Sequence, residues 1–331
     1  MHKRAESAVG KDDGQAGDKV REAIAVALQR CASYSRPLLE KACADALEAA
    51  GWKPEFGCRL LIKPNLLRAQ ADGLCCTHPE VVRAAVIYAQ ACGARVTVGD
   101  SPAFGSAVRV ADSIGLLEAL KGLDAPVVTL DSPISCILPS GISIGIARLA
   151  LESDALLNLP RVKAHSQMRL TLAVKNLFGC VSGVSKAIAH TKHGDRGNRF
   201  ESMIVELDEM LPPTAALVDG ITCMHRTGPS GGDPYSLGLI GASTSCIALD
   251  TALYSVLQLQ AEDLPLWAEL QRRSALGAFA ADLMFPLLKP EDFEAANFEI
   301  PRQLKPVSFR PATLLRSLAR RIWHRYGPSS Q

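Results

Sequence analysis

Short apolar runs that end in polar residues alternate with helical patterns along this chain of 331 residues. The runs at 58–67, 95–99 and 155–160 have the leucine and β-branched content of buried strands, and a helical pattern at 79–92 stands between the first two. Because parallel strands need a crossover connection, this order predicts an α/β fold with a mainly parallel mixed sheet and flanking helices. The length suffices for two lobes, which we expect to surround a cleft.

Other segments carry more specific expectations. A helix is predicted from Asp18 to Cys31, because apolar residues recur there at helical spacing. Residues 134–147 have the pattern of two strands about a turn, which would add antiparallel strands to the sheet. The remaining expectations are a short turn and helix at 168–174, a long loop at 222–236 and an irregular helical region at 264–288.

Charge and composition divide the chain into three parts. Residues 1–17 are polar and contain glycine, and we predict that they are disordered. Residues 18–301 are predicted to form a single α/β domain with two lobes. From Arg302 to the end there are seven Lys or Arg and no acid, so the overall charge of +2 leaves the rest at about −5 (2 − 7). We therefore predict that the segment 302–331 is a basic helical tail.

Several protein classes are disfavoured by composition. No run reaches the roughly 18 apolar residues that a membrane span needs, and the N-terminus has no apolar region typical of a secretory signal. Ten cysteines in a chain of this length do not form a small disulfide scaffold, and several stand in apolar periodic stretches. We expect a reduced, cytoplasmic protein without a transmembrane segment.

The stretch 157–183 places polar residues in otherwise apolar sequence. It contains Lys163, His165, Lys175 and Asn176, and lysine is rarely buried unless it is paired. Lysine and asparagine donate hydrogen bonds that suit a carboxylate or a phosphate, while a histidine titrates near neutral pH and suits a general base or a metal ligand. We take Lys163, His165 and Lys175 as candidate catalytic residues.

Further polar residues follow the ends of the predicted strands. In parallel α/β sheets, ligands bind beyond the carboxyl ends of the strands. We therefore expect these residues to join the stretch 157–183 in a ligand site, and the structural alternative is that the lysines pair with the two aspartates. The residues in this position are Lys63, Asn65, Asp100, Asp219 and Gly220.

Thr77 and His78 stand directly before Pro79, where a helix is predicted to begin. Thr77 fits a helix cap, and the alternative is that both residues help to hold an anion at the helix N-terminus. Cys75 and Cys76 form an adjacent pair in the preceding loop. Since the chain has no Cys-x-x-Cys, we do not expect this pair to have a zinc or redox role.

Six segments together closely resemble the domain-of-unknown-function family 362. The resemblance runs from about residue 55 to 260, and its densest part implies the site around Lys163, His165 and Lys175. It implies an α/β fold with two lobes. The segments are KPNLL at 63–67, THPEVVRA at 77–84, VTVGDS at 96–101, LPRVKAHSQMRLTLAVKNLFG at 159–179, VDGI at 218–221 and GP at 228–229.

Relatives in this family often carry an appended ferredoxin module with clustered cysteines. No two cysteines of this chain are three positions apart, so no ferredoxin-type iron–sulfur motif is present in the sequence. The resemblance therefore implies a fold and a site, but not an iron–sulfur cofactor.

Three functions follow as hypotheses. The first is an enzyme that transfers a proton on a small carboxylate or phosphate: the lysines hold the anion, Asn65 and Asn176 orient it, and His165 moves the proton. In this hypothesis Asp100 or Asp219 orients His165 or binds a divalent metal. The second is an accessory protein of iron–sulfur or metal-cofactor redox metabolism. The third is contact with an anionic membrane surface or nucleic acid through the tail at 302–331.

Overall fold

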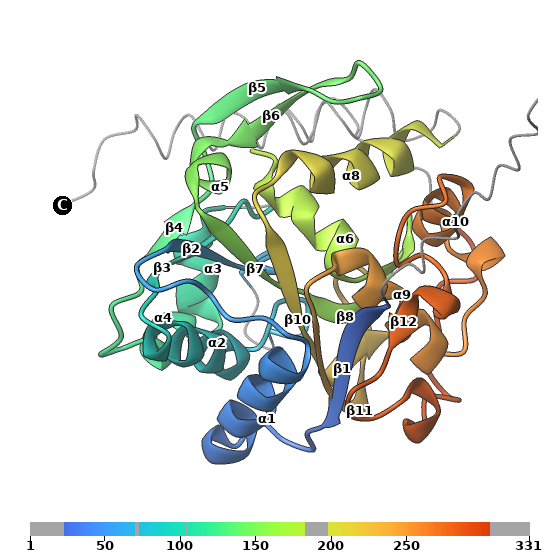
Figure 1. Ribbon diagram of the computed structural model, residues 1–331, viewed down its shortest axis with the longest axis horizontal. Helices are drawn as coiled ribbons and strands as arrows, with labels where there is room; N and C mark the ends of the chain where they lie inside the picture. The colour runs from blue at the N-terminus through green and yellow to red at the C-terminus, as the bar shows by residue number, and fades with distance from the viewer. Residues whose placement is uncertain (1–22, 70–72, 104, 183–197, 305–331) are drawn as a thin grey trace, which may run out of the picture.

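The computed structural model describes residues 23–69, 73–103, 105–182 and 198–304. Within them one large sheet runs through the molecule, with helices on both sides (Figure 1). Its strands are β1 (Ile24–Arg30), β2 (Arg59–Pro64), β3 (Arg95–Asp100), β4 (Val127–Thr129), β7 (Ala155–Leu159), β8 (Arg161–His165), β9 (Arg169–Thr171), β10 (Thr214–His225), β11 (Asp233–Ser243) and β12 (Leu283–Met284).

The helices connect or flank these strands. They are α1 (Arg36–Ala49), α2 (Pro79–Ala91), α3 (Ala107–Ser113), α4 (Leu116–Ala119), α5 (Arg148–Glu152), α6 (Ala173–Asn176), α8 (Arg199–Met210), α9 (Cys246–Val256) and α10 (Pro265–Arg272). Short 3-10 helices occur at η1 (Leu177–Cys180), η2 (Ala261–Asp263), η3 (Ala280–Asp282) and η4 (Pro290–Asp292).

The sheet is mostly parallel, which confirms the predicted fold class. Strands β10, β7, β2, β3 and β4 lie side by side and parallel, and β8 also pairs with β10 in parallel. Antiparallel pairs join β10 to β11, β11 to β1, and β8 to β9. The two lobes and the cleft between them stay predictions.

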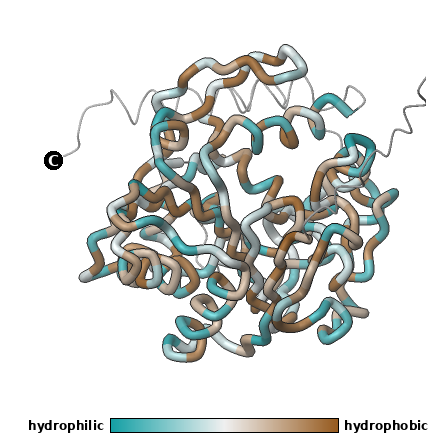
Figure 2. Tube along the Cα trace, viewed as in Figure 1, coloured by the Kyte–Doolittle hydropathy of each residue, from teal (hydrophilic) through white to brown (hydrophobic). Residues whose placement is uncertain are grey.

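Each side of the sheet has its own hydrophobic core. Side chains alternate along a strand, so Leu60 and Ile62 of β2 join one core while Leu61 joins the other. Helices α1 to α4 cover the first side, which we call the α1 face. Helices α6, α8, α9 and α10 cover the second side, which we call the α9 face. Hydrophobic residues accordingly concentrate along the strands and the inner sides of the helices (Figure 2).

The helix predicted from Asp18 to Cys31 is wrong where the structure describes it. Residues 24–30 form strand β1, which lies between β11 and β12. Val26, Ala27 and Leu28 are all fully buried, because both faces of the strand are covered. A short apolar segment that is buried on both sides cannot be distinguished from a helix by periodicity alone.

The structure corrects four further expectations. Strands β5 (Pro133–Ile137) and β6 (Ser143–Ala147) pair antiparallel, as expected, but form a separate two-stranded sheet. The segment 168–174 contributes strand β9 and only the start of α6. The long loop expected at 222–236 is shorter, because β10 and β11 continue their pairing from Thr222 to His225. Between 264 and 288 only α10 is an α-helix.

The predicted disorder of residues 1–17 and nearly all of the basic tail lie outside the described residues. Among the residues that are described, no helix combines the length and the apolar character that crossing a bilayer requires.

Candidate functional site

A buried ion pair stands at the carboxyl ends of β2 and β3. Lys63 Nζ lies 2.9 Å from Asp100 Oδ1, and the two residues are 0% and 2% exposed. Lys63 Nζ also donates to the carbonyl oxygen of Pro64 at 3.0 Å. The Asp100 carboxylate accepts the backbone N–H groups of Leu66 and Ser101 at 2.7 and 2.8 Å. The predicted pairing of a lysine with Asp100 is therefore present, and it fixes the loop that follows β2.

Gly179 packs directly on this ion pair. A Cβ atom at Gly179 would lie 2.2 Å from Asp100 Oδ1 and 2.3 Å from Lys63 Nζ. These separations are shorter than any contact between non-bonded heavy atoms, so any side chain at this position would displace the pair. The glycine of the NLFG segment is thus required by close approach to buried charge.

A chain of side-chain amides extends from the ion pair. Asn158 of β7 accepts a hydrogen bond from Asn176 Nδ2 at 2.7 Å, and Asn176 Oδ1 accepts one from Asn65 Nδ2 at 2.8 Å. At the other end, Asn158 Nδ2 donates to the carbonyl oxygen of Ala173 at 2.9 Å. The amide nitrogen of Asn65 donates to Asn176, so the amide oxygen of Asn65 is the atom that accepts a hydrogen bond from Lys163.

Lys163 is a buried amine with two neutral acceptors. Its Nζ donates to Asn65 Oδ1 and to the carbonyl oxygen of Cys75, the latter at 2.7 Å, and the residue is 2% exposed. Burial lowers the pKa of Lys163 to about 8, although the nearby Cys76, Cys75 and Asp100 partly oppose this shift. Among the described residues no carboxylate lies within ion-pair distance of this amine.

Thr171 stands directly opposite Lys163 in the ladder between β8 and β9. Opposed residues of an antiparallel pair point to the same side of the sheet, with Cβ atoms about 5 Å apart. Thr171 is 4% exposed, and its Oγ1 has no hydrogen-bond partner within the described part of the chain. A buried hydroxyl without a partner costs free energy, so this atom is an unused donor and acceptor beside a buried amine.

His165 follows two positions after Lys163 on β8, so both side chains leave the same side of that strand. Its Nδ1 accepts hydrogen bonds from the backbone N–H groups of Gln167 and Met168 at 3.1 and 3.3 Å. An accepting Nδ1 carries no proton, so the neutral ring has its proton on Nε2. Gly228 approaches the same strand so closely that a Cβ atom would lie 1.7 Å from the Ala164 carbonyl oxygen.

Asp219 belongs to a second polar group, on the α1 face. Its Oδ1 accepts from the Tyr34 hydroxyl at 2.9 Å, and its Oδ2 accepts from the backbone N–H of His78 at 2.9 Å. Arg161 Nη1 lies 3.2 Å from the same oxygen. The partner of Asp219 is therefore an arginine, and none of the three candidate lysines pairs with it among the described residues.

The residue that caps α2 is His78 and not Thr77, which was expected to do so. His78 is the N-cap residue, and its Nδ1 accepts the backbone N–H of Glu80 at 3.2 Å. Its ring stacks on Tyr34, with centroids 3.6 Å apart, and burial lowers its pKa. Thr77 instead accepts the Asn65 backbone N–H at 2.8 Å and donates to the Leu159 carbonyl oxygen at 2.6 Å. Thr77 therefore ties two strand ends together.

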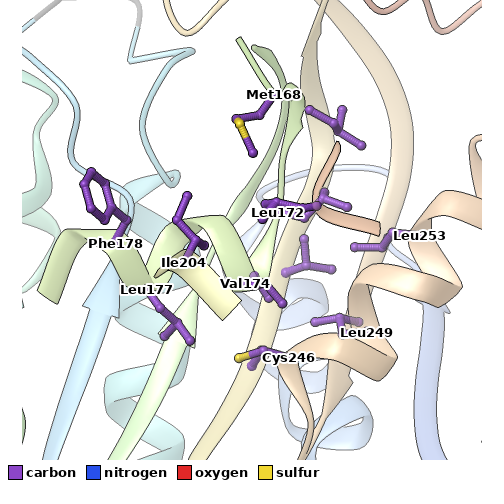
Figure 3. Close-up of a cluster of buried hydrophobic side chains, with 14 of the residues drawn as sticks. Met168, Leu172, Val174, Leu177, Phe178, Ile204, Cys246, Leu249 and Leu253 are labelled. Carbon is purple, nitrogen blue, oxygen red and sulfur yellow. The ribbon is translucent and has the colours of Figure 1, made fainter. Parts of the chain in front are cut away.

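Lys175 and Asn176 lie on the short helix α6, which is held by Asp250 of α9. The two oxygens of the Asp250 carboxyl group accept the backbone N–H groups of Ala173 and Val174 at 2.7 and 3.0 Å. Lys175 Nζ lies 4.8 Å from the ring centroid of Phe178. Figure 3 shows the apolar side chains around α6 and η1, with Leu249 and Leu253 of α9 among them. Packing and the carboxylate together fix the direction in which α6 presents its polar residues.

Gly220 lies where the pairing of β10 with β11 changes register, between Gly220 and Thr222. A Cβ atom there would lie 3.0 Å from the Leu239 carbonyl oxygen, so the glycine is favoured by the closeness of the neighbouring strand.

The site contains residues that the sequence analysis did not select. Polar residues in apolar runs were the available signal for Asn158 within ALLNLP and Asp250 within CIALDTAL. Arg161 follows Pro160 and marked the end of a strand pattern, so its burial was not anticipated. The residues missed are Tyr34, Asn158, Arg161, Thr171 and Asp250.

The donor set does not favour the divalent metal proposed from the sequence. In the described part of the chain, no three His, Cys, Asp or Glu side chains converge as metal ligands would. The oxygens of Asp100 and Asp219 already accept hydrogen bonds from Lys63, Arg161 and backbone N–H groups.

Residues 60–255 match the family described as Domain of unknown function (DUF362). The chain belongs to this family. This confirms the resemblance seen in the sequence. The chain is also 38% identical, over 306 residues, to the "Thylakoid-associated protein sll1697" of Synechocystis sp., which covers 91% of this chain and 95% of that relative.

Two solved structures are similar at lower identity. One is the lactate racemase apoprotein from Thermoanaerobacterium thermosaccharolyticum, with a TM-score of 0.43 and 14% identity over 70% of this chain and 57% of that one. The other is a structural-genomics protein from Thermotoga maritima, with a TM-score of 0.41 and 12% identity over 64% of this chain and 56% of that one. The matched part is thus little more than half of each of these proteins.

The buried ion pair gives a prediction about stability. We expect Lys63→Met to lower the free energy of unfolding by about 3–5 kcal/mol, because Asp100 would remain buried without its cation. Lys41→Met is the control, since the Lys41–Asp45 pair is exposed and should contribute about 0.5 kcal/mol or less. Urea denaturation monitored by circular dichroism measures both. Equal effects of the two substitutions would contradict the assigned role of Lys63.

Asp250 gives a prediction about pH. Burial raises the pKa of Asp250 from its ordinary 3.8 to about 8, although the N–H groups of Val174 and Ala173 partly oppose this. Between these values the folded chain keeps a proton that the unfolded chain has lost, so the stability difference between the native protein and Asp250→Asn should fall as the pH rises from about 4 to about 8. Urea denaturation across this range tests it, and parallel stability curves would refute it.

Proposed function

We propose that this protein binds a small carboxylate or phosphate beside Lys163 and transfers a proton there. The single observation that carries the proposal is the buried Lys163 amine, which has two neutral acceptors and no carboxylate in ion-pair range among the described residues. A buried charge without a counter-ion is costly, and an anionic ligand would supply one.

The neighbouring charges support an anion rather than a cation. Lys63 is balanced by Asp100 and Arg161 by Asp219, so among the described residues neither of these carboxylates is left to pair with Lys163, and the titratable group that most raises its pKa is the Cys76 thiol. The Thr171 hydroxyl opposite Lys163, which has no partner in the described part of the chain, adds a hydrogen-bond donor for the same oxygen-rich ligand. An ammonium and a hydroxyl on the same side of the β8–β9 pair suit a carboxylate or phosphate oxygen.

The pKa of Lys163 suits proton transfer near neutral pH. With a value of about 8, the amine gives up and regains a proton at modest cost, as an efficient general acid or base must. A bound anion favours the charged form and raises this pKa, so the protonated amine would act as the acid in the complex. His165 is the second proposed proton carrier. Abstraction of a proton next to a carboxylate is the reaction class that these groups fit.

The test uses acetate, malonate, citrate and inorganic phosphate as probes, with binding measured by isothermal titration calorimetry. Thr171→Val keeps the side-chain shape and removes only a hydroxyl that has no partner among the described residues, so stability should not fall. Binding of the tightest probe should weaken by roughly 10- to 100-fold, which corresponds to about 1.5–3 kcal/mol for a hydrogen bond to a charged group. Lys163→Met should abolish binding, whereas Lys53→Met at an exposed position should leave it unchanged.

The pH dependence provides an independent check on the same complexes. Below about pH 8 the amine is already charged, so binding takes up little proton; above it, binding should take up a proton and weaken as the pH rises. Calorimetry in buffers with different ionisation enthalpies measures this uptake. Binding that survives Lys163→Met, or that shows no proton uptake above pH 8, would exclude Lys163 as the anion-binding amine.

Attachment to an anionic membrane surface is a second candidate function. The relative that is 38% identical is called thylakoid-associated, and the segment from Arg302 onward has seven Lys or Arg and no acid. Basic residues near an anionic surface contribute about 1 kcal/mol each. This candidate concerns the tail alone and is independent of the site at Lys163.

The tail is tested in the full-length chain by sedimentation with lipid vesicles. We expect binding to vesicles that contain phosphatidylserine and little binding to pure phosphatidylcholine, with a loss of binding as salt is raised. Replacement of Arg316, Arg320, Arg321 and Arg325 by glutamine should reduce the bound fraction about tenfold or more. Equal binding by the substituted chain, or a preference for duplex DNA over vesicles, would overturn this candidate.

A further inference from the structure

Cys75 and Cys76 bring two sulfur atoms together in the loop before α2. Their Sγ atoms are 3.9 Å apart, and both residues are buried, with 1% and 0% exposure. The backbone N–H of Leu67 donates a hydrogen bond to Cys76 Sγ at 3.4 Å. A close pair of thiols, held by a backbone donor, is an arrangement in which one sulfur can attack the other after oxidation.

The surroundings of this pair are positively charged. Lys163 donates to the carbonyl oxygen of Cys75, and Arg161 Nη1 donates to that of Cys76 at 2.9 Å. The hydrogen bond from Cys75 lowers the pKa of the Cys76 thiol to about 6, and the charge of Lys163 and the N–H of Leu67 add to this against the opposing effect of burial. Electropositive surroundings lower the pKa of a thiol and so favour the reactive thiolate.

Two other fully buried cysteines differ in this respect. Burial raises the pKa of the Cys43 and Cys223 thiols, and within the described residues neither has a second sulfur as a hydrogen-bond partner. They therefore serve as internal controls of equal burial and opposite chemistry.

We propose that Cys75 and Cys76 form a redox-active pair that a peroxide converts into a disulfide between adjacent residues. The Cys76 thiolate attacks one oxygen of hydrogen peroxide, the O–O bond breaks, hydroxide leaves and a sulfenic acid forms on Cys76. The Cys75 thiol then attacks that sulfur, an S–S bond forms, the S–O bond breaks and water leaves. Two thiols are oxidised and one peroxide is reduced to two waters, with the Cys76 proton neutralising the hydroxide.

A peroxide is the class of oxidant that this burial admits, because it is compact and uncharged. The absence of Cys-x-x-Cys argued against a redox role from sequence alone, but that spacing is not needed when adjacent sulfurs already lie this close. Since a thiol–disulfide exchange reverses the bond, a dithiol reductant returns the pair to its starting state.

Formation of this disulfide must move the peptide group between the two cysteines. Adjacent Cα atoms are about 3.8 Å apart across a trans peptide, which is shorter than the usual separation of about 4.4–6.8 Å across a disulfide. The same peptide group is held at both ends: its N–H donates to the Gly73 carbonyl oxygen at 2.8 Å, and its oxygen accepts from Lys163 at 2.7 Å. Oxidation would therefore withdraw an acceptor from Lys163. This regulatory consequence rests on the proposed function, whereas the disulfide does not.

The experiment treats the full-length, reduced protein with one equivalent of hydrogen peroxide under native conditions. Remaining thiols are then blocked with iodoacetamide after denaturation, and tryptic peptides are measured by mass spectrometry. We expect the peptide containing Cys75 and Cys76 to lose two hydrogen atoms and to escape alkylation until dithiothreitol is added. Its oxidation should be at least about tenfold faster than that of Cys43 or Cys223.

Cys75→Ser separates the two steps, because it leaves Cys76 without its resolving thiol. The variant should accumulate a sulfenic acid at Cys76, trapped as a dimedone adduct, while the native pair should show little adduct. Oxidation of Cys43 or Cys223 at the same rate as the pair, or an absence of the disulfide in the native protein, would overturn the proposal. Phosphate or carboxylate binding is read separately, so failure of the site at Lys163 would leave this result intact.

Discussion

The loop from Gly73 to His78 holds together the strand ends on which the rest of the site depends. Cys75 and Cys76 present carbonyl oxygens to Lys163 and Arg161, and Thr77 donates to the end of β7. The backbone N–H of His78 donates to Asp219 at the centre of β10. Because nearly all of these groups are buried and several carry charge, each would be costly if left unpaired. A single irregular segment thus satisfies polar groups from three strands.

Strand parity explains which predicted residues converge. Side chains alternate along β8, and that of Val162 joins the core of the α9 face. The side chains of Arg161, Lys163 and His165 therefore leave β8 toward the α1 face. Lys63 and Asn158 leave their strands toward the α9 face, and Asp219 leaves β10 toward the α1 face. Asn65 connects the polar residues on the two sides of the sheet, since it accepts a hydrogen bond from Lys163 and donates one to Asn176.

Much of this arrangement could be predicted from sequence, and the limits have physical causes. The strand ends that carry Lys63 and Asp100 were identifiable because parallel sheets bring their carboxyl ends to one edge. Asp219 was placed in the same site because its strand was expected to end there, whereas β10 continues to His225 and directs Asp219 toward the α1 face. The helix expected at 18–31 failed where a strand buried on both faces has no alternation to show. The position of Thr171 opposite Lys163 depends on the pairing of β8 with β9, and the short distance between the sulfurs of Cys75 and Cys76 depends on the folded loop, so neither could be predicted from the sequence.

The separation in sequence of the residues that meet at this site has a consequence for how the chain folds. The hydrogen bond from His78 to Asp219 joins positions 141 apart, and that from Asn65 to Asn176 joins positions 111 apart. Contacts between such distant positions form slowly, since the intervening chain must lose its freedom first. During synthesis, Lys63 and Asp100 emerge well before the strand that carries Asp219. The hydrogen bonds that join the loop before α2 to Asp219 therefore cannot form until β10 has been synthesised, so this part of the candidate site is completed late.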